Sequence, residues 1–304
     1  MKNIIPSLSF ILVLNYGSSL KAQQLSNFNT YNYDLMQVNV AAMGSSAFQA
    51  NLNYRTQAIK INDHPSLYQL NAFLSLGEKN AVGIKTYQNT IGLMAFNTIS
   101  GAYSYRLKFS EKASLNMGLG ISYYQVRFNA QKAIVTNGDD PNLGTGAGLR
   151  ANNFDCEVGT ELKLKELKAG VAVLHLYNTD KNLGTVQNKT PRELNFYATY
   201  NFKVSSKFEI APWFLDRYKE GVGFVPEGLL NLTIAKAIGL GIGYRYSNSV
   251  LANAMVKLSA IKVVYSYEYT LGQVNRYIGS THQIMLGFDL QKKKKDSATT
   301  DEQK

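Results

Sequence analysis

The strongest constraint in this sequence is that apolar and polar residues alternate along one segment after another. Over residues 261–270 the odd positions hold Ile, Val, Tyr, Tyr and Tyr, and the even positions hold Lys, Val, Ser, Glu and Thr. Over residues 115–124 the odd positions are again apolar, with Asn, Gly and Ser among the even ones. Segments 48–55, 238–245 and 282–290 show the same split. A period of two is typical of a strand with two unlike faces, so the chain is predicted to be all-β.

Strand length and the spacing of the strands favour a membrane barrel over a soluble β-sandwich, which also alternates. The apolar face over residues 115–123 is about as long as one bilayer crossing by a tilted strand. About fourteen such segments are expected, an even number as in single-chain bacterial barrels. We therefore predict a transmembrane up-and-down antiparallel β-barrel of about 14 strands over residues 47–290, in the outer membrane of a Gram-negative bacterium.

The links between these segments alternate in length, as they do in an up-and-down barrel with short periplasmic turns and longer outer loops. The short turns are expected near residues 77–80, 110–113, 165–167, 204–206, 237–238 and 259–260. The longer links are expected at residues 56–66, 88–96, 129–150, 177–190, 217–225 and 272–280. Only the link at 246–251 is short where a long one is expected.

Both ends of the chain are predicted to lie outside the strands. Residues 1–22 have a basic start at Lys2, a short apolar stretch and a polar exit, the pattern of a secretory signal peptide cleaved near Ala22. The apolar stretch is too short to cross a bilayer as a helix. Residues 23–46 are either a periplasmic linker or a plug, and the charged residues 291–304 are expected to form a disordered periplasmic tail.

Charged residues within the predicted strands fall on the face opposite the apolar one. They are assigned to the lumen, because charge that faces lipid is costly. The expected lumen network comprises Arg55, Arg106, Asp155, Glu157, Glu161, Arg245, Lys262 and Glu268, with Lys108, Lys163, Glu209 and Asp289 on the same face. Both signs of charge are present, which favours a plugged interior joined by ion pairs over a selective channel. A wet channel is the alternative.

Composition suits a barrel and argues against several functions. The chain has 20 Tyr, 14 Phe and 24 Gly against 6 Pro, as expected of aromatic girdles. The formal charge is +11, but the basic residues are scattered over turns and strands, so solvated turns are expected rather than a nucleic-acid site. The single Cys156 and three scattered histidines offer no metal-ligand spacing, and no serine stands in a G-x-S-x-G setting. No metal, cofactor or enzymatic activity is predicted.

Several blocks of sequence, in a fixed order, carry a family resemblance. The leader from Gln23 contains NVAAMG at Asn39–Gly44 and is followed by a first strand ending in Tyr-Arg. YSYRLKFSEKASLNMGLGIS (Tyr103–Ser122), DPNLGTG after Gly138 and YEYTLGQVNRYIGSTHQIMLGFDL (Tyr267–Leu290) follow. Together they resemble the PorP/SprF family of outer-membrane proteins associated with type IX secretion in Bacteroidetes. At NVAAMG the proline and tyrosine of the family's Asn-Pro-Ala-Tyr-Ala-Gly type element are missing.

The resemblance implies a fourteen-strand barrel that acts with the type IX machinery. Its partners would be secreted, surface-displayed adhesins or periplasmic components of the motor complex, besides outer-membrane lipid. The expected function is to support export or surface anchoring of such a protein by presenting outer loops to its adhesin-like C-terminal domain. The candidate loops are Asn137–Leu149 and Asn178–Lys189, with Asn137, Asp139, Asp140, Asn142, Leu143, Asn178, Asp180, Lys181 and Asn182 as candidate contact residues.

Two other hypotheses stay open at this point. One is a passive or hydrophobic-substrate channel, porin-like or similar to fatty-acid transporters, which conductance in planar bilayers would test. The other is a soluble β-sandwich adhesin, which would stay in solution without detergent.

Overall fold

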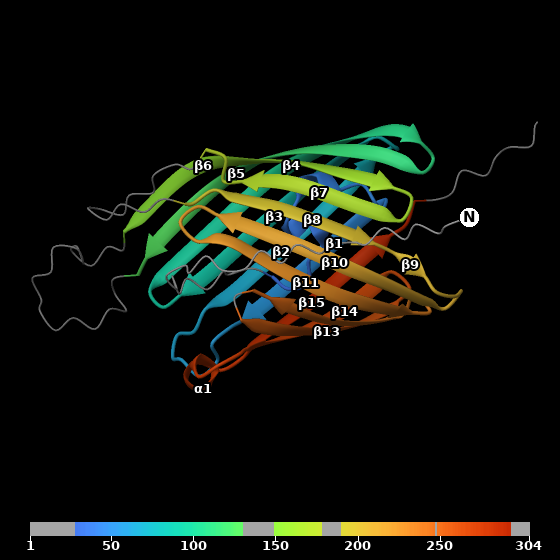
Figure 1. The fold of residues 1–304 in the computed structure, drawn as a ribbon. Coiled ribbons are helices and arrows are strands. Elements are labelled where there is room, and N and C mark those ends of the chain that lie inside the picture. The colour runs from blue at the N-terminus through green and yellow to red at the C-terminus, as the bar shows by residue number, and fades with distance from the viewer. Residues whose placement is uncertain (1–27, 130–148, 178–189, 247, 293–304) are drawn as a thin grey trace, which may run out of the picture.

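The computed structural model describes residues 28–129, 149–177, 190–246 and 248–292, which form a closed antiparallel β-barrel (Figure 1). The predicted signal peptide, all nine candidate loop residues and the tail beyond Lys292 lie outside the described residues. Within the described part of the chain, no helix has the length and apolarity needed to span a membrane.

The strands run around the barrel in chain order. Their bounds are β1 (Phe48–Thr56), β2 (Ser66–Leu76), β3 (Asn80–Ile91), β4 (Met94–Ser110), β5 (Ala113–Phe128), β6 (Arg150–Leu164), β7 (Leu167–Leu174), β8 (Glu193–Tyr200), β9 (Phe202–Lys203), β10 (Phe208–Lys219), β11 (Gly223–Ile234), β12 (Ile238–Arg245), β13 (Ser249–Leu258), β14 (Ile261–Thr270) and β15 (Thr281–Leu290). A short helix, α1 (Val274–Ile278), lies between β14 and β15.

The sheet closes because the first strand pairs with the last. β1 and β15 are antiparallel from Phe48 opposite Leu290 to Thr56 opposite His282. β8 and β9 follow one another and both pair with β10, so together they count as one barrel strand. The prediction of an all-β, fourteen-strand up-and-down barrel is confirmed. With an even number of strands both termini lie at one end, which is the periplasmic end by the rule for such barrels.

Two of the predicted long links are wrong. β3 continues to Ile91 and β4 begins at Met94, so 88–96 is a tight hairpin whose turn contains Gly92 at φ +55°. β10 and β11 likewise extend until only residues 220–222 separate them, with Gly221 at φ +82°. Polar residues marked these segments as loops in the sequence. Near the outer end, however, strand residues extend beyond the bilayer and can be polar on their outward face. Polarity there therefore does not distinguish a strand from a loop.

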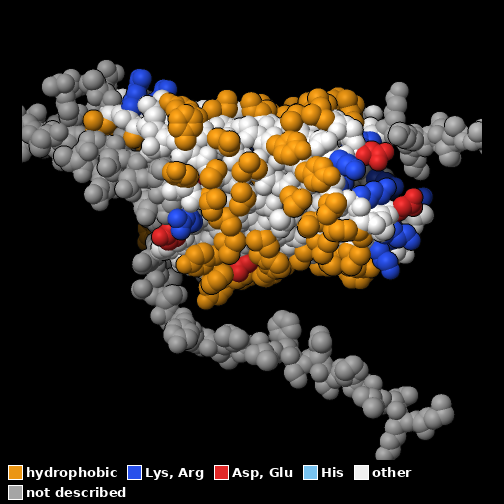
Figure 2. Space-filling model, turned by 90° about the horizontal axis from the view of Figure 1, so that it is seen from above, with side chains coloured by type: hydrophobic (Ala, Val, Ile, Leu, Met, Phe, Trp, Pro, Cys, Tyr) orange, Lys and Arg blue, Asp and Glu red, His pale blue; other side chains and the backbone are white. Residues whose placement is uncertain are grey.

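The outer wall of the barrel is apolar and the inner face is polar. Leu119 and Val263 face outward with 47% and 43% of their surfaces exposed, whereas the neighbouring Val264 faces the lumen and is fully buried. Figure 2 shows apolar side chains spread over the wall between the two ends, with charged side chains mostly at the ends. This distribution is that of a wall in contact with lipid.

The wall is taller along β4, β5 and β6, which have 17, 16 and 15 residues against 8 in β7, β8 and β12. At the outer end of these long strands Gln125 and Arg127 alternate with Tyr124 and Val126. Tyr124, Val126 and Ala151 form a buried cluster, with Met94, Phe96 and Leu149 packed against it.

Residues 28–47 lie inside the barrel and fill much of its lumen (Figure 1). This segment, called the plug below, contains the 3₁₀ helices η1 (Leu35–Gln37) and η2 (Val40–Ala42). η2 packs against β4, β5 and β6. Glycine makes this approach possible: a Cβ atom at Gly118 would lie 2.5 Å from the backbone nitrogen of Ala41, and one at Gly159 would collide with the Asn39 side chain.

The first prediction concerns which face meets lipid. In a Cys156→Ser background, a nitroxide label at Val263→Cys should collide with lipid-dissolved oxygen, because this side chain faces outward. A label at Ser266→Cys, an inward position on the same strand, should be protected from it. Continuous-wave EPR power saturation measures both. A protected label at 263 would show that the barrel has the opposite polarity.

Candidate functional site

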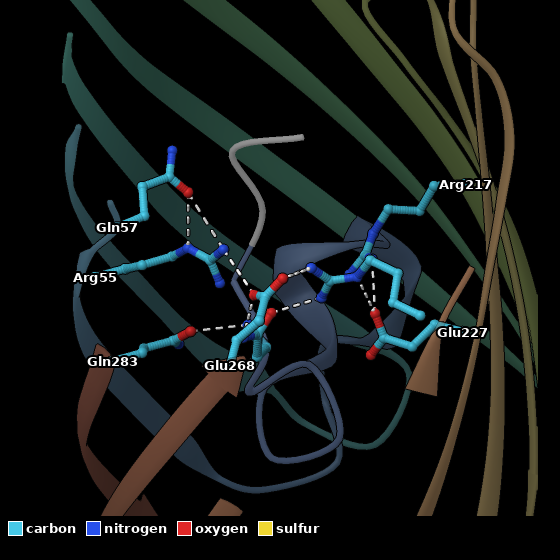
Figure 3. Close-up of polar contacts among 8 residues, drawn as sticks. Arg55, Gln57, Arg217, Glu227, Glu268 and Gln283 are labelled. Atoms are coloured by element: carbon cyan, nitrogen blue, oxygen red, sulfur yellow. Dashed lines mark hydrogen bonds and ion pairs between the residues drawn. The ribbon is translucent and has the colours of Figure 1, made fainter. Parts of the chain in front are cut away.

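A chain of buried ion pairs joins five strands across the lumen (Figure 3). Arg55 Nη2 of β1 lies 2.9 Å from Glu268 Oε2 of β14, and Arg245 Nη1 of β12 lies 2.9 Å from Glu268 Oε1. Arg245 Nε lies 2.6 Å from Glu227 Oε2 of β11, and Arg217 Nη1 of β10 lies 3.4 Å from the same oxygen. All five side chains are at most 3% exposed.

The start of the plug is bonded directly into this chain. Asn29 Nδ2 donates to Glu268 Oε2 at 2.9 Å, and Arg245 Nη2 donates to Asn29 Oδ1 at 2.6 Å. The Asn29 backbone N–H donates to Gln283 Oε1 at 2.8 Å. Gln283 in turn donates to Thr30 Oγ1 at 2.7 Å. The plug therefore supplies hydrogen-bond partners to Glu268, Arg245 and Gln283 of this network.

The electrostatics of this network make its members depend on one another. A buried ion pair gains little over apolar packing, but removal of one partner leaves an uncompensated charge that is strongly destabilising. Glu268 and Glu227 each bridge two arginines, and Glu268 also accepts from Asn29 of the plug, so it links the ion pairs to the plug. The Arg217 guanidinium also stands over the Tyr31 ring of the plug, 5.5 Å from its centroid, which adds a cation–π contact.

The middle of the plug is held by a second set of contacts. Asn39 caps η2 by accepting from the Ala41 N–H at 2.9 Å, and its Nδ2 donates to the Thr160 carbonyl at 2.9 Å. Lys262 donates to the Tyr33 carbonyl at 2.7 Å. Burial raises the pKa of the Asp34 carboxyl, and nearby Lys262 partly offsets this rise.

The last residues of the plug meet the wall near the periplasmic end. Arg106 Nη2 donates to the Gly44 carbonyl at 2.9 Å, and its Nε donates to Asn116 Oδ1 at 3.0 Å. Gly44 itself has φ +84°, a left-handed conformation that favours glycine. The NVAAMG element thus contacts the wall at both its ends, through Asn39 and Gly44.

The structure places all eight residues of the expected lumen network on the inner face, but not in one cluster. Arg55, Arg245 and Glu268 share the ion-pair chain. Glu157 pairs with Lys85 at 2.7 Å, and Asp155 accepts from His175 at 2.9 Å. The remaining three make the following contacts: Arg106 with Gly44, Lys262 with Tyr33, and Glu161 with Tyr197 at 2.6 Å.

Sequence reasoning missed four members of these contacts. Arg217 is the first residue of the segment taken for a loop, residues 217–225, and Glu227 lies two residues beyond its end. Pro226 argued against a strand there. Lys85 lies close to the other segment taken for a loop. Asn29 precedes the barrel strands and carries no period. Glu227 shares the inward face with the apolar Val225 and Leu229, so no alternation of polarity marked it.

An open cavity of about 640 Å³ lies inside the barrel beside the plug. Its lining includes the aromatic residues Phe28, Tyr87, Phe96 and Tyr124 together with Val126. The polar part of the lining includes Lys85, Glu157, Asp155, His175 and Arg217. Among the described residues no group of three His, Cys, Asp or Glu side chains is placed to hold a metal ion.

Comparison with known proteins identifies the family of this barrel. The family model described as type IX secretion system membrane protein PorP/SprF matches residues 20–288. The chain belongs to the PorP/SprF family. It is therefore an outer-membrane barrel of type IX secretion, as the resemblance in the sequence implied. No curated protein matches this PorP/SprF chain significantly.

Solved structures share the fold at low identity. The CymD monoaromatic hydrocarbon channel aligns with TM-score 0.52 and 12% identity, over 88% of this chain and 94% of that one. The Pseudomonas putida toluene transporter TodX aligns with TM-score 0.50 and 10% identity, over 84% and 94% of the two chains. These similarities show that the PorP/SprF barrel has an outer-membrane barrel fold, and they extend no further.

The second prediction tests the ion-pair chain. Glu268→Gln should lower the free energy of unfolding by about 3–5 kcal/mol, because Arg55 and Arg245 lose their shared counter-charge in a buried site. Glu166→Gln is the matched control, since it breaks the solvent-exposed pair with Lys203 and should leave stability nearly unchanged. Urea unfolding in phospholipid vesicles, followed by Trp213 fluorescence, measures both. Equal stability of the two variants would contradict the role given to Glu268.

Proposed function

We propose that this barrel is a closed scaffold that supports export or cell-surface anchoring of a secreted, adhesin-like protein. The observation that carries the proposal is the plug, which residues of β1, β12, β14 and β15 hold through buried bonds to Asn29 and Thr30. In this proposal, a segment bonded in this way obstructs the passage of bulk solute through the lumen. A barrel with such a lumen acts through its rims and loops.

Membership of the PorP/SprF family supports the link to secretion. In the scaffold proposal the outer loops that follow β5 and β7 receive the terminal domain of the cargo. β4, β5 and β6 are the longest strands of the wall, and the first of these loops joins β5 to β6. Loops on a rigid wall are common sites for partner recognition.

The third prediction tests whether the plug closes the lumen. The intact protein should give no steady current in planar bilayers, and deletion of Phe28–Ser46 should produce a steady conductance, because the plug contacts would be lost. Deletion of Ser297–Lys304 is the control and should remain silent. Heat-modifiable migration on gels confirms that each variant is folded. A steady open current from the intact protein would overturn the closed scaffold.

The fourth prediction tests the outer loop. Deletion of Asn137–Gly148 should abolish surface display of the cargo while the barrel stays folded. Leu149 is retained because its carbonyl accepts from the Phe128 N–H at 2.9 Å. Surface biotinylation and mass spectrometry of intact cells would measure the loss. A same-length Gly/Ser replacement separates the loss of loop residues from the shortening of the loop, and unchanged display in both variants would remove this loop from the proposal.

A channel for hydrophobic molecules is the second candidate function. The cavity beside the plug favours it, since its lining includes Phe28, Tyr87, Phe96 and Tyr124 and its volume suits a small ligand. CymD and TodX, with the same fold, are described as a hydrocarbon channel and a toluene transporter. Uptake of an apolar aromatic tracer into proteoliposomes would favour this channel, whereas a scaffold would take up none above empty vesicles.

A further inference from the structure

A row of lysines crosses the inner face of the barrel near its periplasmic end. Lys108 of β4 lies opposite Ser114 of β5, and Ser114 lies opposite Lys163 of β6. Lys163 lies directly opposite Lys168 of β7, and Lys168 lies opposite Thr199 of β8. These five positions, called the lysine row below, are one step closer to the rim than the row that contacts the plug.

The orientation of the row follows from the strand period. Lys108 lies two residues after Arg106, and Lys163 lies two residues after Glu161. Arg106 bonds to the plug, and Glu161 accepts from the inward-facing Tyr197. Residues two apart in a strand share a face, so the three lysines face the lumen.

The lysine row contains a repulsion that no ion pair among the described residues relieves. Like charges directly opposite one another in a sheet are destabilising, and Lys163 and Lys168 are such a pair. Among the described residues, none of the three row lysines takes part in an ion pair. Two acids close to the row in the sequence are engaged elsewhere. Glu166, in the turn between β6 and β7, pairs with Lys203 at 2.7 Å, and Glu161 of β6 accepts from Tyr197.

A buried polar atom at the end of the row also lacks a partner. Thr199 is 7% exposed, and its Oγ1 atom makes no hydrogen bond. A hydroxyl of this kind donates readily to a carboxylate. Three unpaired ammonium groups and this hydroxyl on one inward face are therefore complementary to an anionic ligand.

The position of the row decides which anion can reach it. Lipid headgroups surround the outside of the wall, whereas the row faces the inside of the mouth. The plug does not supply the charge, because residues 28–47 contain only Asp34, and that carboxyl already accepts from Asn71 at 2.8 Å. The tail after Leu290 holds more lysines than acids.

Lysines on the periplasmic turns strengthen the positive field around this mouth. They include Lys79, Lys112, Lys165, Lys207 and Lys236. Figure 2 shows Lys and Arg side chains gathered at the end of the barrel on the right of the view. A rim with one dominant sign attracts a partner of the opposite sign and speeds its association.

We propose that the lysine row is a docking site for an acidic peptide segment, rich in Asp or Glu, of a periplasmic protein. The segment enters the periplasmic mouth and places carboxylates between Lys108, Lys163 and Lys168. It then lies one row from Arg106, which holds the end of the plug. This proposal depends only on which end of the barrel faces the periplasm. It is therefore independent of the proposed role in cargo display.

The experiment uses the full-length protein in phosphatidylcholine nanodiscs and a dye-labelled hexaglutamate peptide, with hexaglutamine as the neutral probe. Fluorescence anisotropy should show that the protein binds hexaglutamate but not hexaglutamine. The affinity for hexaglutamate should fall as the salt concentration is raised. The triple variant Lys108→Gln, Lys163→Gln, Lys168→Gln should weaken binding by about tenfold or more, because it removes the contact charges.

The matched control is the triple variant Lys79→Gln, Lys207→Gln, Lys236→Gln, which removes the same charge from turns outside the row. It should weaken binding by no more than about threefold, through steering alone. Equal weakening by the two triple variants would overturn the site, as would equal binding of hexaglutamine or no binding by the unaltered protein.

A stability measurement tests the same row without any ligand. Lys168→Gln should raise the unfolding midpoint of the free protein, and Lys168→Glu should raise it further by pairing with Lys163. Lys168→Glu should also abolish hexaglutamate binding. Because its raised unfolding midpoint shows that the variant is folded, this loss of binding cannot be attributed to misfolding. A lowered midpoint in both variants would show that the pair does not repel, and the proposal would fail.

Discussion

A backbone amide in lipid has no water to bond with, so a chain can cross a bilayer as strands only if every strand has two neighbours. Here the pairing of β1 with β15 meets that condition, because it joins the two edges that an open sheet would leave. Closure also divides the side chains into two sets. One set faces lipid, and the other faces a lumen of limited width in which polar groups must find partners among themselves.

The lumen meets part of that demand by taking in a segment of its own chain. Asn29 completes the bonding of Glu268 and Arg245, while Asn39 and Gly44 contact the opposite wall. Small residues on the strands make the fit possible, as Gly118 and Gly159 show. The same buried pairs that would be costly if left alone therefore become the means by which the plug is held.

The sequence was sufficient to predict the fold because each strand shows its own two-residue period, and the number of strands follows from counting these segments. The inward side of Arg55, Arg245 and Glu268 followed from parity alone. Their partners did not, because pairing across the lumen depends on strand tilt and on which residues of the plug come between. Glu227 and Arg217 were missed for a different reason: Pro226 and the polar residues around them resemble a loop when the membrane boundary is unknown.

The tall part of the wall has a consequence for how the molecule meets its surroundings. Beyond Tyr123, β5 continues for about five residues, which at roughly 3.3 Å each gives a collar standing clear of the headgroups. In this collar the polarity is inverted: Gln125 and Arg127 face out, while Phe96 and Val126 face in. The collar has the polarity of a sheet in a water-soluble protein, whereas the rest of the wall has the polarity of a membrane barrel. The apolar contacts of this collar lie on its inner face, so they do not depend on a surrounding bilayer.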